Sequence, residues 1–176
     1  MFKWLSLLVV ILSYFDSNGQ NRIDTGKSSI VFKIKNFGIP VNGSVSGLKG
    51  DIHFDKKDPG SSHFSVSVQM GTINTGIGAR DKHIKKAEWL FVDKFSVSSF
   101  NSNKVWLNSD GQYQVTGILT IKGTSKSISF PFTAKDVNGG TKFLGSFTIN
   151  RREFGVGGSS LSMSDNLSII LSVFAD

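Results

Sequence analysis

Cysteine is absent from this chain of 176 residues, so disulfide bridges, thiolate chemistry and a lipid anchor on cysteine are all excluded. Histidine is scarce, with three residues and no HxH or HExxH spacing, and the sequence therefore predicts no metal site. A GxSxG motif is lacking too, and the GGSS segment at 157–160 is typical of a loop. We predict a protein that is not an enzyme and that uses no cofactor.

The apolar run near the N-terminus is too short to cross a bilayer. It covers residues 4–12 and precedes Ser17 and Gly19, which suit the minus-three and minus-one positions of a cleavage site, whereas a spanning helix needs about 20 apolar residues. We expect a cleaved signal peptide at residues 1–19 and one domain at 20–176. An uncleaved anchor is the alternative. Export of a chain without cysteine favours the periplasm.

Acidic residues are outnumbered by basic ones. The chain has 13 Asp and Glu against 20 Lys and Arg, a formal net charge of +7. The lysines are scattered, and no basic run is paired with a stacking-aromatic motif, so the sequence indicates no nucleic-acid partner. The positive charge favours anionic surfaces, and transient contact with a membrane surface is expected.

Most of the remaining sequence alternates apolar and polar residues. Ile30, Phe32 and Ile34 fall on one face of their segment, while Lys33 and Lys35 fall on the other. A period of two indicates a β-strand with one buried face. Turn signals such as DKKDPGSS, NSDGQ and VNGGT separate the segments, which predicts an antiparallel all-β chain. The same alternation recurs at residues 63–70, 128–134, 143–149 and 166–175.

Phenylalanine is abundant, with 15 copies, most of them on the alternating apolar faces. About eight strands at this spacing form either a two-sheet sandwich or a closed barrel. Phenylalanine has no polar group to satisfy, so it can line a dry cavity without an unmade hydrogen bond. A barrel of about eight strands has room for side chains or for one elongated ligand. The sequence leaves both a packed and a hollow interior open.

Six motifs follow one another along nearly all of the chain after residue 20. They are FxIxNF at 32–37, VNGSVSGLKGDIHFD at 41–55, INTGxxxRDKHI at 73–84, WLFVDKF at 89–95, VTGILTIKGTSKSISFPF at 115–132 and INRREFGVG at 149–157. In this order they resemble the YceI-like family of polyisoprenoid-binding periplasmic proteins. Trp89-Leu90-Phe91 and Ser96 depart slightly from the family pattern, the first near the expected pocket mouth.

The resemblance implies an extended, lipocalin-like antiparallel β-barrel of eight strands, with a short helix after residue 81. In such a barrel the interior holds a long apolar chain, for example a polyisoprenoid or the tail of an isoprenoid quinone. We expect inward residues of the strands, together with the Trp89–Phe91 segment, to line this interior. The candidate cavity residues are Phe32, Ile34, Phe54, Phe64, Val66, Val68, Trp89, Phe91, Leu119, Phe130, Phe132, Phe147, Ile169 and Leu171.

Charge gathers in the segment NTGIGARDKHIKKAEWL at 74–90. Asp81 precedes good helix formers, so we expect its carboxylate to cap a short helix. Gly76 lets the end of the strand bend sharply, and the guanidinium of Arg80 can bridge carbonyls or a carboxylate. We assign Asp81 and Gly76 structural roles. Arg80 and His83 remain candidates for the rim, where a polar headgroup would lie.

A second charged segment, NRREFGVG, contains Arg151 where a strand meets a turn. As a rim residue, Arg151 would belong to a cationic surface that meets anionic headgroups. The alternative is a surface salt bridge with Glu153, with Phe154 as an apolar anchor, and the sequence favours this alternative.

We predict a protein that binds, carries or sequesters a long-chain apolar amphiphile in the periplasm. Its ligand would be a polyisoprenoid or an isoprenoid quinone, held by burial of its apolar tail. A fatty acid or fatty amide is an alternative ligand. A stress-related interaction protein with a filled core is an alternative of a different class, and a homodimer is left open.

Overall fold

The computed structural model describes residues 21–176, so the predicted signal peptide at residues 1–19 lies outside the described part of the chain. Within residues 21–176 no helix is long and apolar enough to cross a membrane. The elements in chain order are β1 (Asn21–Arg22), β2 (Ser29–Asn36), β3 (Ile39–His53), the 3-10 turn η1 (Pro59–Ser61), β4 (His63–Asn74), α1 (Gly78–Ile84), β5 (Val97–Leu107), β6 (Tyr113–Ile121), β7 (Thr124–Val137), β8 (Gly140–Asn150), the 3-10 turn η2 (Arg151–Phe154) and β9 (Met163–Ala175).

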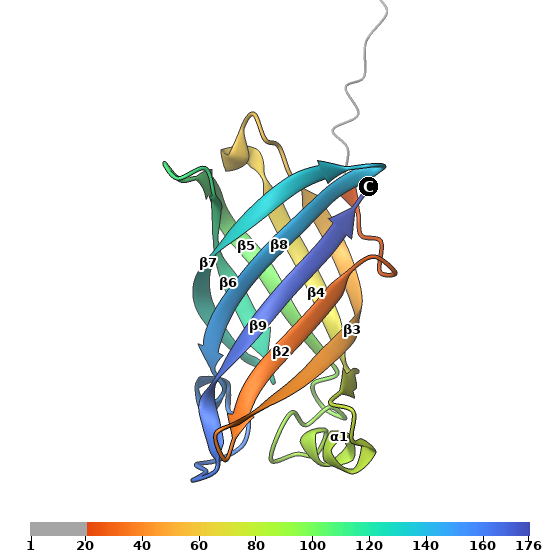
Figure 1. The fold of residues 1–176 in the computed structure, drawn as a ribbon, viewed down its shortest axis with the longest axis vertical. Coiled ribbons are helices and arrows are strands. Elements are labelled where there is room, and N and C mark those ends of the chain that lie inside the picture. Colours follow the sequence, from red (N-terminus) through yellow and green to blue (C-terminus); the bar gives the residue numbers. More distant parts are fainter. Residues whose placement is uncertain (1–20) are drawn as a thin grey trace, which may run out of the picture.

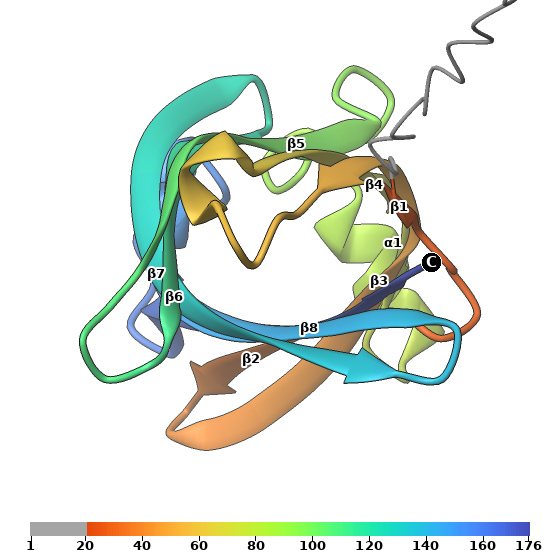
Figure 2. The same ribbon diagram turned by 90° about the horizontal axis from the view of Figure 1, so that it is seen from above.

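The strands form a closed antiparallel barrel, as predicted, and not a sandwich. Neighbours pair in the order β1-β3-β2-β9-β8-β7-β6-β5-β4, and β3 also pairs with β4, which closes the ring. Figure 2 looks down the barrel and shows the strands arranged in a ring. Strand β1 adds only two residues to the edge of β3. Eight strands therefore make the wall, a number that leaves an interior for side chains or one small ligand.

Alternation decides which side chains point into the barrel. In β2, Phe32 lies opposite Gly43 of β3 and Ile169 of β9, and all three sit on the inner face. Lys33 and Lys35 lie on the outer face and are exposed. The inward residues predicted for β4, β7, β8 and β9 also belong to the interior cluster or pack against it, so the period of two was a sound guide to the faces of these strands.

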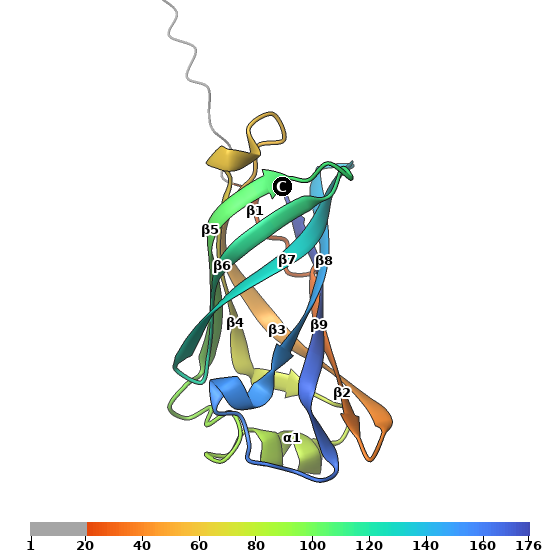
Figure 3. The ribbon, with the colours of Figure 1, turned by 90° about the vertical axis from the view of Figure 1, so that its left-hand side faces the viewer.

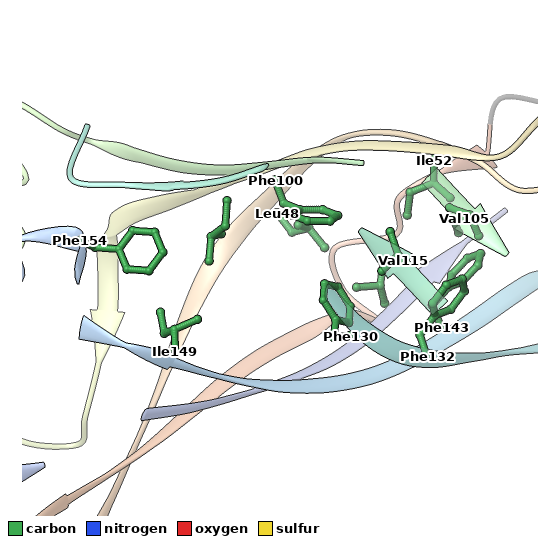
Figure 4. Close-up of a cluster of buried hydrophobic side chains, with 13 residues drawn as sticks. Leu48, Ile52, Phe100, Val105, Val115, Phe130, Phe132, Phe143, Ile149 and Phe154 are labelled. Carbon is green, nitrogen blue, oxygen red and sulfur yellow. The ribbon is translucent and has the colours of Figure 1, made fainter. Parts of the chain in front are cut away.

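The interior is packed unevenly along the barrel axis. Val105 and Val115 are fully buried. Figure 4 shows Ile52, Val105, Val115, Phe132 and Phe143 gathered together, whereas Ile149 and Phe154 stand apart from them. We call the end of the barrel that holds this group the closed end.

Aromatic rings fill the closed end. Phe54 meets Tyr113 edge to face with 5.0 Å between ring centroids, and Phe143 in the same way at 5.3 Å. Phe132 lies 5.5 Å from Phe64 and stacks on Tyr113 at 5.4 Å. Rings at these separations fill space densely and add about 0.5–1.5 kcal/mol per pair beyond the burial of their area.

The opposite end of the barrel carries α1, the β2–β3 hairpin, η2 and the loop that precedes β9. Figures 1 and 3 show these segments together, away from the β7–β8 turn and the C-terminus. We call it the α1 end.

Candidate functional site

An apolar cavity of about 290 Å³ occupies the barrel between the closed end and the α1 end. Its wall comes from inward residues of several strands, from α1 and from η2. Many of these side chains point inward and are still only half-buried, because they border empty space and not other atoms. The predicted cavity residues that line it are Phe32, Ile34, Val66, Val68, Trp89, Leu119, Phe130, Phe147, Ile169 and Leu171.

The aromatic side chains lie against the wall of the cavity and leave its centre free. Gly43 faces Phe32 across the sheet, and a Cβ on Gly43 would overlap the Phe32 ring. Gly117 has the same relation to Phe100, since a Cβ on Gly117 would stand 2.6 Å from Phe100 Cζ. A glycine in a strand commonly marks such a close approach. Here it lets a large ring cover backbone without blocking the barrel.

Four predicted cavity residues do not line the cavity. Phe54, Phe64 and Phe132 belong to the aromatic cluster of the closed end. Phe91 has a left-handed backbone with φ of 49°, and its ring packs against that of Phe95 with 6.0 Å between the centroids. Alternation gives the face of a strand on which a residue lies, but it does not give the height of that residue along the barrel.

Several cavity residues were missed by the sequence analysis. Phe100 and Ile149 follow the alternation of β5 and β8, although the many polar residues of β5 obscure the signal there. Leu48 of β3 does not follow the alternation of Val41 and Val45, because the register of β3 shifts between Ser44 and Lys49. Phe154 also lines the cavity and is 2% exposed, so its predicted role as an apolar anchor is confirmed.

Two buried polar atoms in the cavity wall have no hydrogen-bond partner among the described residues. They are Ser98 Oγ and Asn36 Oδ1. Ser98 lies on β5 opposite Val68, and its side chain is buried in an otherwise apolar part of the wall. A buried polar atom without a partner is costly, so these two positions are where a polar group of a ligand would be best accepted.

The charged segment between β4 and β5 forms a compact latch. The Asp81 carboxylate accepts hydrogen bonds from the backbone N–H and the hydroxyl of Thr75. Arg80 Nε donates to Thr75 Oγ1 at 2.7 Å, and Arg80 Nη2 donates to the Thr75 carbonyl at 2.7 Å. Of the two kinds of acceptor expected for Arg80, the structure shows a carbonyl, and the Arg80 side chain also lines the cavity. Both charged residues therefore fix the end of β4 against α1.

The predicted helix cap is wrong in its position. The helix begins at Gly78, four residues earlier than expected, and its N-cap is Ile77, which makes no side-chain cap bond. Asp81 lies inside the helix, and its carboxylate reaches back to Thr75 and not to the free N–H groups of the first turn. Gly76 has φ of 80°, and this left-handed turn directs the chain from β4 into α1.

His83 lies where the cavity meets solvent. Its Nε2 accepts a hydrogen bond of 2.8 Å from Trp89 Nε1. Among the described residues that line the cavity, only His83 is exposed. We therefore place the mouth of the cavity beside α1, with His83 at the mouth and the indole of Trp89 just inside.

Arg151 is buried, which the sequence analysis did not foresee. Its side chain is 2% exposed and lines the cavity. Nε donates to the Ser164 carbonyl at 3.0 Å, and Nη1 donates to the carbonyls of Val156 at 2.8 Å and Gly158 at 3.0 Å. Its guanidinium also lies over the Trp89 ring, 5.6 Å from the centroid, a cation–π contact.

The predicted salt bridge with Glu153 is wrong. Arg151 Nη2 pairs with Asp165 Oδ1 at 2.9 Å, and Arg152 Nη1 pairs with Asp165 Oδ2 at 3.3 Å. The η2 turn points the Arg151 side chain inward to the start of β9, whereas Glu153 is exposed. A sequence separation of two residues suggested the wrong partner, because the true partner comes from the next strand.

The chemistry of the cavity is that of a binding site. Within residues 21–176, no three or more His, Asp or Glu side chains stand close enough to hold a metal ion. The groups whose pKa is clearly lowered are three aspartates outside the cavity wall, Asp24, Asp55 and Asp136. An apolar wall with a few polar groups at one end suits an amphiphile whose tail lies deepest.

Comparison with known proteins agrees with the order of motifs in the sequence. The chain matches the YceI-like domain over residues 22–175. It is 31% identical to a UPF0312 protein of Vibrio campbellii over 158 residues, which cover 84% of this chain and 84% of that relative. It is 29% identical to a UPF0312 protein of Pectobacterium atrosepticum over 168 residues, covering 90% of this chain and 83% of the relative.

Solved structures share the same barrel. BcnA of Burkholderia cenocepacia aligns with a TM-score of 0.84 at 21% identity, over 88% of this chain and 99% of BcnA. A polyisoprenoid-binding domain from Saccharophagus degradans, implicated in plant cell wall breakdown, aligns with a TM-score of 0.69 at 12% identity, over 89% of this chain and 98% of that domain. At these identities the likeness concerns the fold alone. Because the domain match extends over nearly the whole described chain, the protein belongs to the YceI-like family.

Proposed function

We propose that this protein binds a long-chain apolar amphiphile, a polyisoprenoid or an isoprenoid quinone, and carries or sequesters it in the periplasm. The observation that carries the proposal is the apolar cavity of about 290 Å³ between the closed end and the α1 end. The fold of this protein is shared with a domain described as polyisoprenoid-binding. A binding protein, and not an enzyme, is what both the family and the cavity support.

The mechanism we propose is burial of the tail. Each methylene removed from water contributes roughly 0.8 kcal/mol, before the cost of association is subtracted. The aromatic rings of the closed end set the depth that a tail can reach. The volume lies near the lower limit of about 300–1,000 Å³ for ligand pockets, so a long polyisoprenoid would extend out through the mouth. The hollow interior favours this function over an interaction protein with a filled core.

A cavity-filling substitution tests the proposal with a matched control on the same strand. Ile169 points into the cavity, and its neighbour Ile170 is an outward residue that is 37% exposed. Ile169→Trp should lower the amount of copurified lipid about tenfold, equivalent to about 1.4 kcal/mol, whereas Ile170→Trp should retain it. Native mass spectrometry followed by organic extraction measures the lipid and separates isoprenoids from fatty acids and fatty amides. Equal lipid content in the two folded variants would rule out the cavity as the binding site.

A further inference from the structure

The four most exposed large apolar side chains of the described chain gather at the α1 end. Leu161 is fully exposed at 111%, Phe37 is 80% exposed, Ile39 is 67% exposed and Ile77 is 53% exposed. They come from three segments far apart in sequence: the β2–β3 hairpin, the start of α1 and the loop before β9, which Figures 1 and 3 place at the same end. We call these four side chains the apolar tip.

The backbone holds Phe37 in an unusual conformation. Phe37 has φ of 50° and Gly38 has φ of 77°, and together they form the two-residue turn between Asn36 and Ile39. Positive φ at both positions favours Asn-Gly in such a hairpin, and a bulky residue there is a genuine outlier. Burial does not compensate Phe37, because its ring is exposed. The fold therefore gains little from this phenylalanine, which suggests that its partner lies outside the chain.

The tip is built as one surface. The backbone N–H of Phe37 donates to the Ser162 carbonyl at 2.7 Å, which ties the hairpin to the loop that carries Leu161. Asn36 pairs with Met163 in the β2–β9 ladder, and both line the cavity. On the other side, Ile77 is the N-cap of α1, the helix that bears His83 at the mouth. The apolar tip thus adjoins the entrance of the cavity.

The charges around the tip are mainly positive. Lys33 and Lys35 are exposed on β2 just before the hairpin, and Lys82 and Lys86 are exposed on α1 and immediately after it. From residue 25 to residue 50 the chain contains lysine but neither Asp nor Glu. The Asp81 carboxylate is already engaged by Thr75, and the Asp165 carboxylate by Arg151 and Arg152. The remaining exposed acids of this end are Glu88, Asp93 and Glu153. Apolar side chains flanked by lysines match an anionic lipid surface.

We propose that the apolar tip inserts into the interface of an anionic phospholipid bilayer and places the mouth of the cavity on the membrane. An amphiphile then passes between bilayer and barrel without exposing its tail to water. The proposal rests on the proposed function, because it assigns a source and a destination to the same ligand. Exposed apolar side chains carried by three separate segments suit a fluid lipid interface better than the groove of a protein partner.

The experiment compares two pairs of exposed apolar residues at opposite ends of the barrel. Phe37→Asn combined with Leu161→Ser removes half of the tip, and asparagine suits the positive φ of position 37. Leu107→Ser combined with Val137→Ser is the control, since these residues are 51% and 42% exposed near the closed end. The protein is isolated from the expressing cells, with its N-terminus determined by mass spectrometry. Binding is measured by flotation with vesicles of phosphatidylethanolamine and phosphatidylglycerol, and with vesicles of phosphatidylcholine alone.

We expect the tip variant to lose vesicle binding at least tenfold, the control variant to bind like the wild type, and binding to the phosphatidylglycerol vesicles to weaken as salt is raised. Equal binding by the tip variant and the wild type, or equal loss in both variants, would overturn the proposal. Absence of wild-type binding to any vesicle would overturn it too and point to a protein partner.

The Ile169→Trp variant separates the two proposals. If it loses its lipid but binds vesicles normally, and the tip variant does the reverse, both proposals stand. If Ile169→Trp keeps its lipid while the tip variant loses vesicle binding, docking stands and ligand binding in the cavity fails. If Ile169→Trp loses its lipid while the tip variant keeps vesicle binding, the cavity stands and docking fails.

Discussion

The closed end and the hollow part of this barrel are made of the same residue types, yet only one of them is packed. At the closed end, Phe54 meets Phe132 and Phe143 edge to face, and the rings of Phe132 and Phe143 lie tilted against each other. In the hollow part, Phe32 and Phe100 lie against glycines of the neighbouring strands and leave the axis free. What separates a core from a cavity is therefore how the rings are placed, since Phe132 at the closed end also lies opposite a glycine, Gly145, and yet contacts several other rings. The number of phenylalanines does not decide it.

The largest expected effect comes from truncating one ring in each region. Phe132→Ala should lower the free energy of unfolding by about 3–5 kcal/mol, because it removes a ring surrounded by other rings. Phe147→Ala should cost roughly half as much, since one side of Phe147 already faces the cavity and its main aromatic contact is Phe130 at 4.6 Å. Urea unfolding measures both. Equal losses would mean that the hollow part is as well packed as the closed end.

The buried guanidinium at the α1 end gives the next effect. Arg151→Met should lower the free energy of unfolding by about 2–4 kcal/mol, because three backbone carbonyls and Asp165 lose their donors. Arg151→Lys should recover only part of it, since an ammonium cannot reach the same acceptors in the same plane. A stable Arg151→Met protein with altered headgroup preference would instead make Arg151 a ligand contact. Thermal unfolding and ligand exchange distinguish the two results.

The Asp81 latch should have a smaller effect. Asp81→Ala removes the acceptor for Thr75 and should cost about 1–2 kcal/mol, whereas Asp81→Asn keeps an amide oxygen and should cost less. The melting temperature checks the order of the two variants. If Asn were as damaging as Ala, the negative charge itself would be required beside Arg80.

Acid should weaken the closed end slightly before the α1 end. Hydrogen bonds from Lys27, from the Lys57 backbone and from Lys56 lower the pKa of Asp24, Asp55 and Asp136, in that order. A lowered folded pKa gives stability that is present at neutral pH and is lost as pH falls below about 4. Asp136 is exposed and Asp24 and Asp55 are only half-buried, so solvent screens their interactions and the effect is small. Hydrogen exchange at decreasing pH should show earlier loss of protection at the β7–β8 turn than at α1, and Asp136→Asn should reduce the difference.

Sequence patterns predicted the barrel well and its filling only in part. Alternation assigned Phe130 and Phe132 to the inner face correctly, but it could not show that one lines the cavity while the other fills the closed end. That difference depends on strand tilt and on pairing partners distant in sequence. The same limit explains Arg151, whose partner Asp165 follows a loop of irregular structure. Local propensity also failed to locate the start of α1, because the left-handed Gly76 turns the chain earlier than the Asp81 signal suggested.

The pairing of β2 with β9 has a consequence for how the barrel folds. Ser29 lies opposite Ser172, so one seam of the wall joins a strand near the beginning of the described chain to the last strand. Contacts between residues so distant in sequence are formed slowly, because a long loop must close before they contribute. Hairpins from β4 to β8 can form early, but the ring stays open until β9 arrives. Until then β2 and β8 each expose an unpaired edge, which makes that interval the one in which the chain is most prone to aggregation.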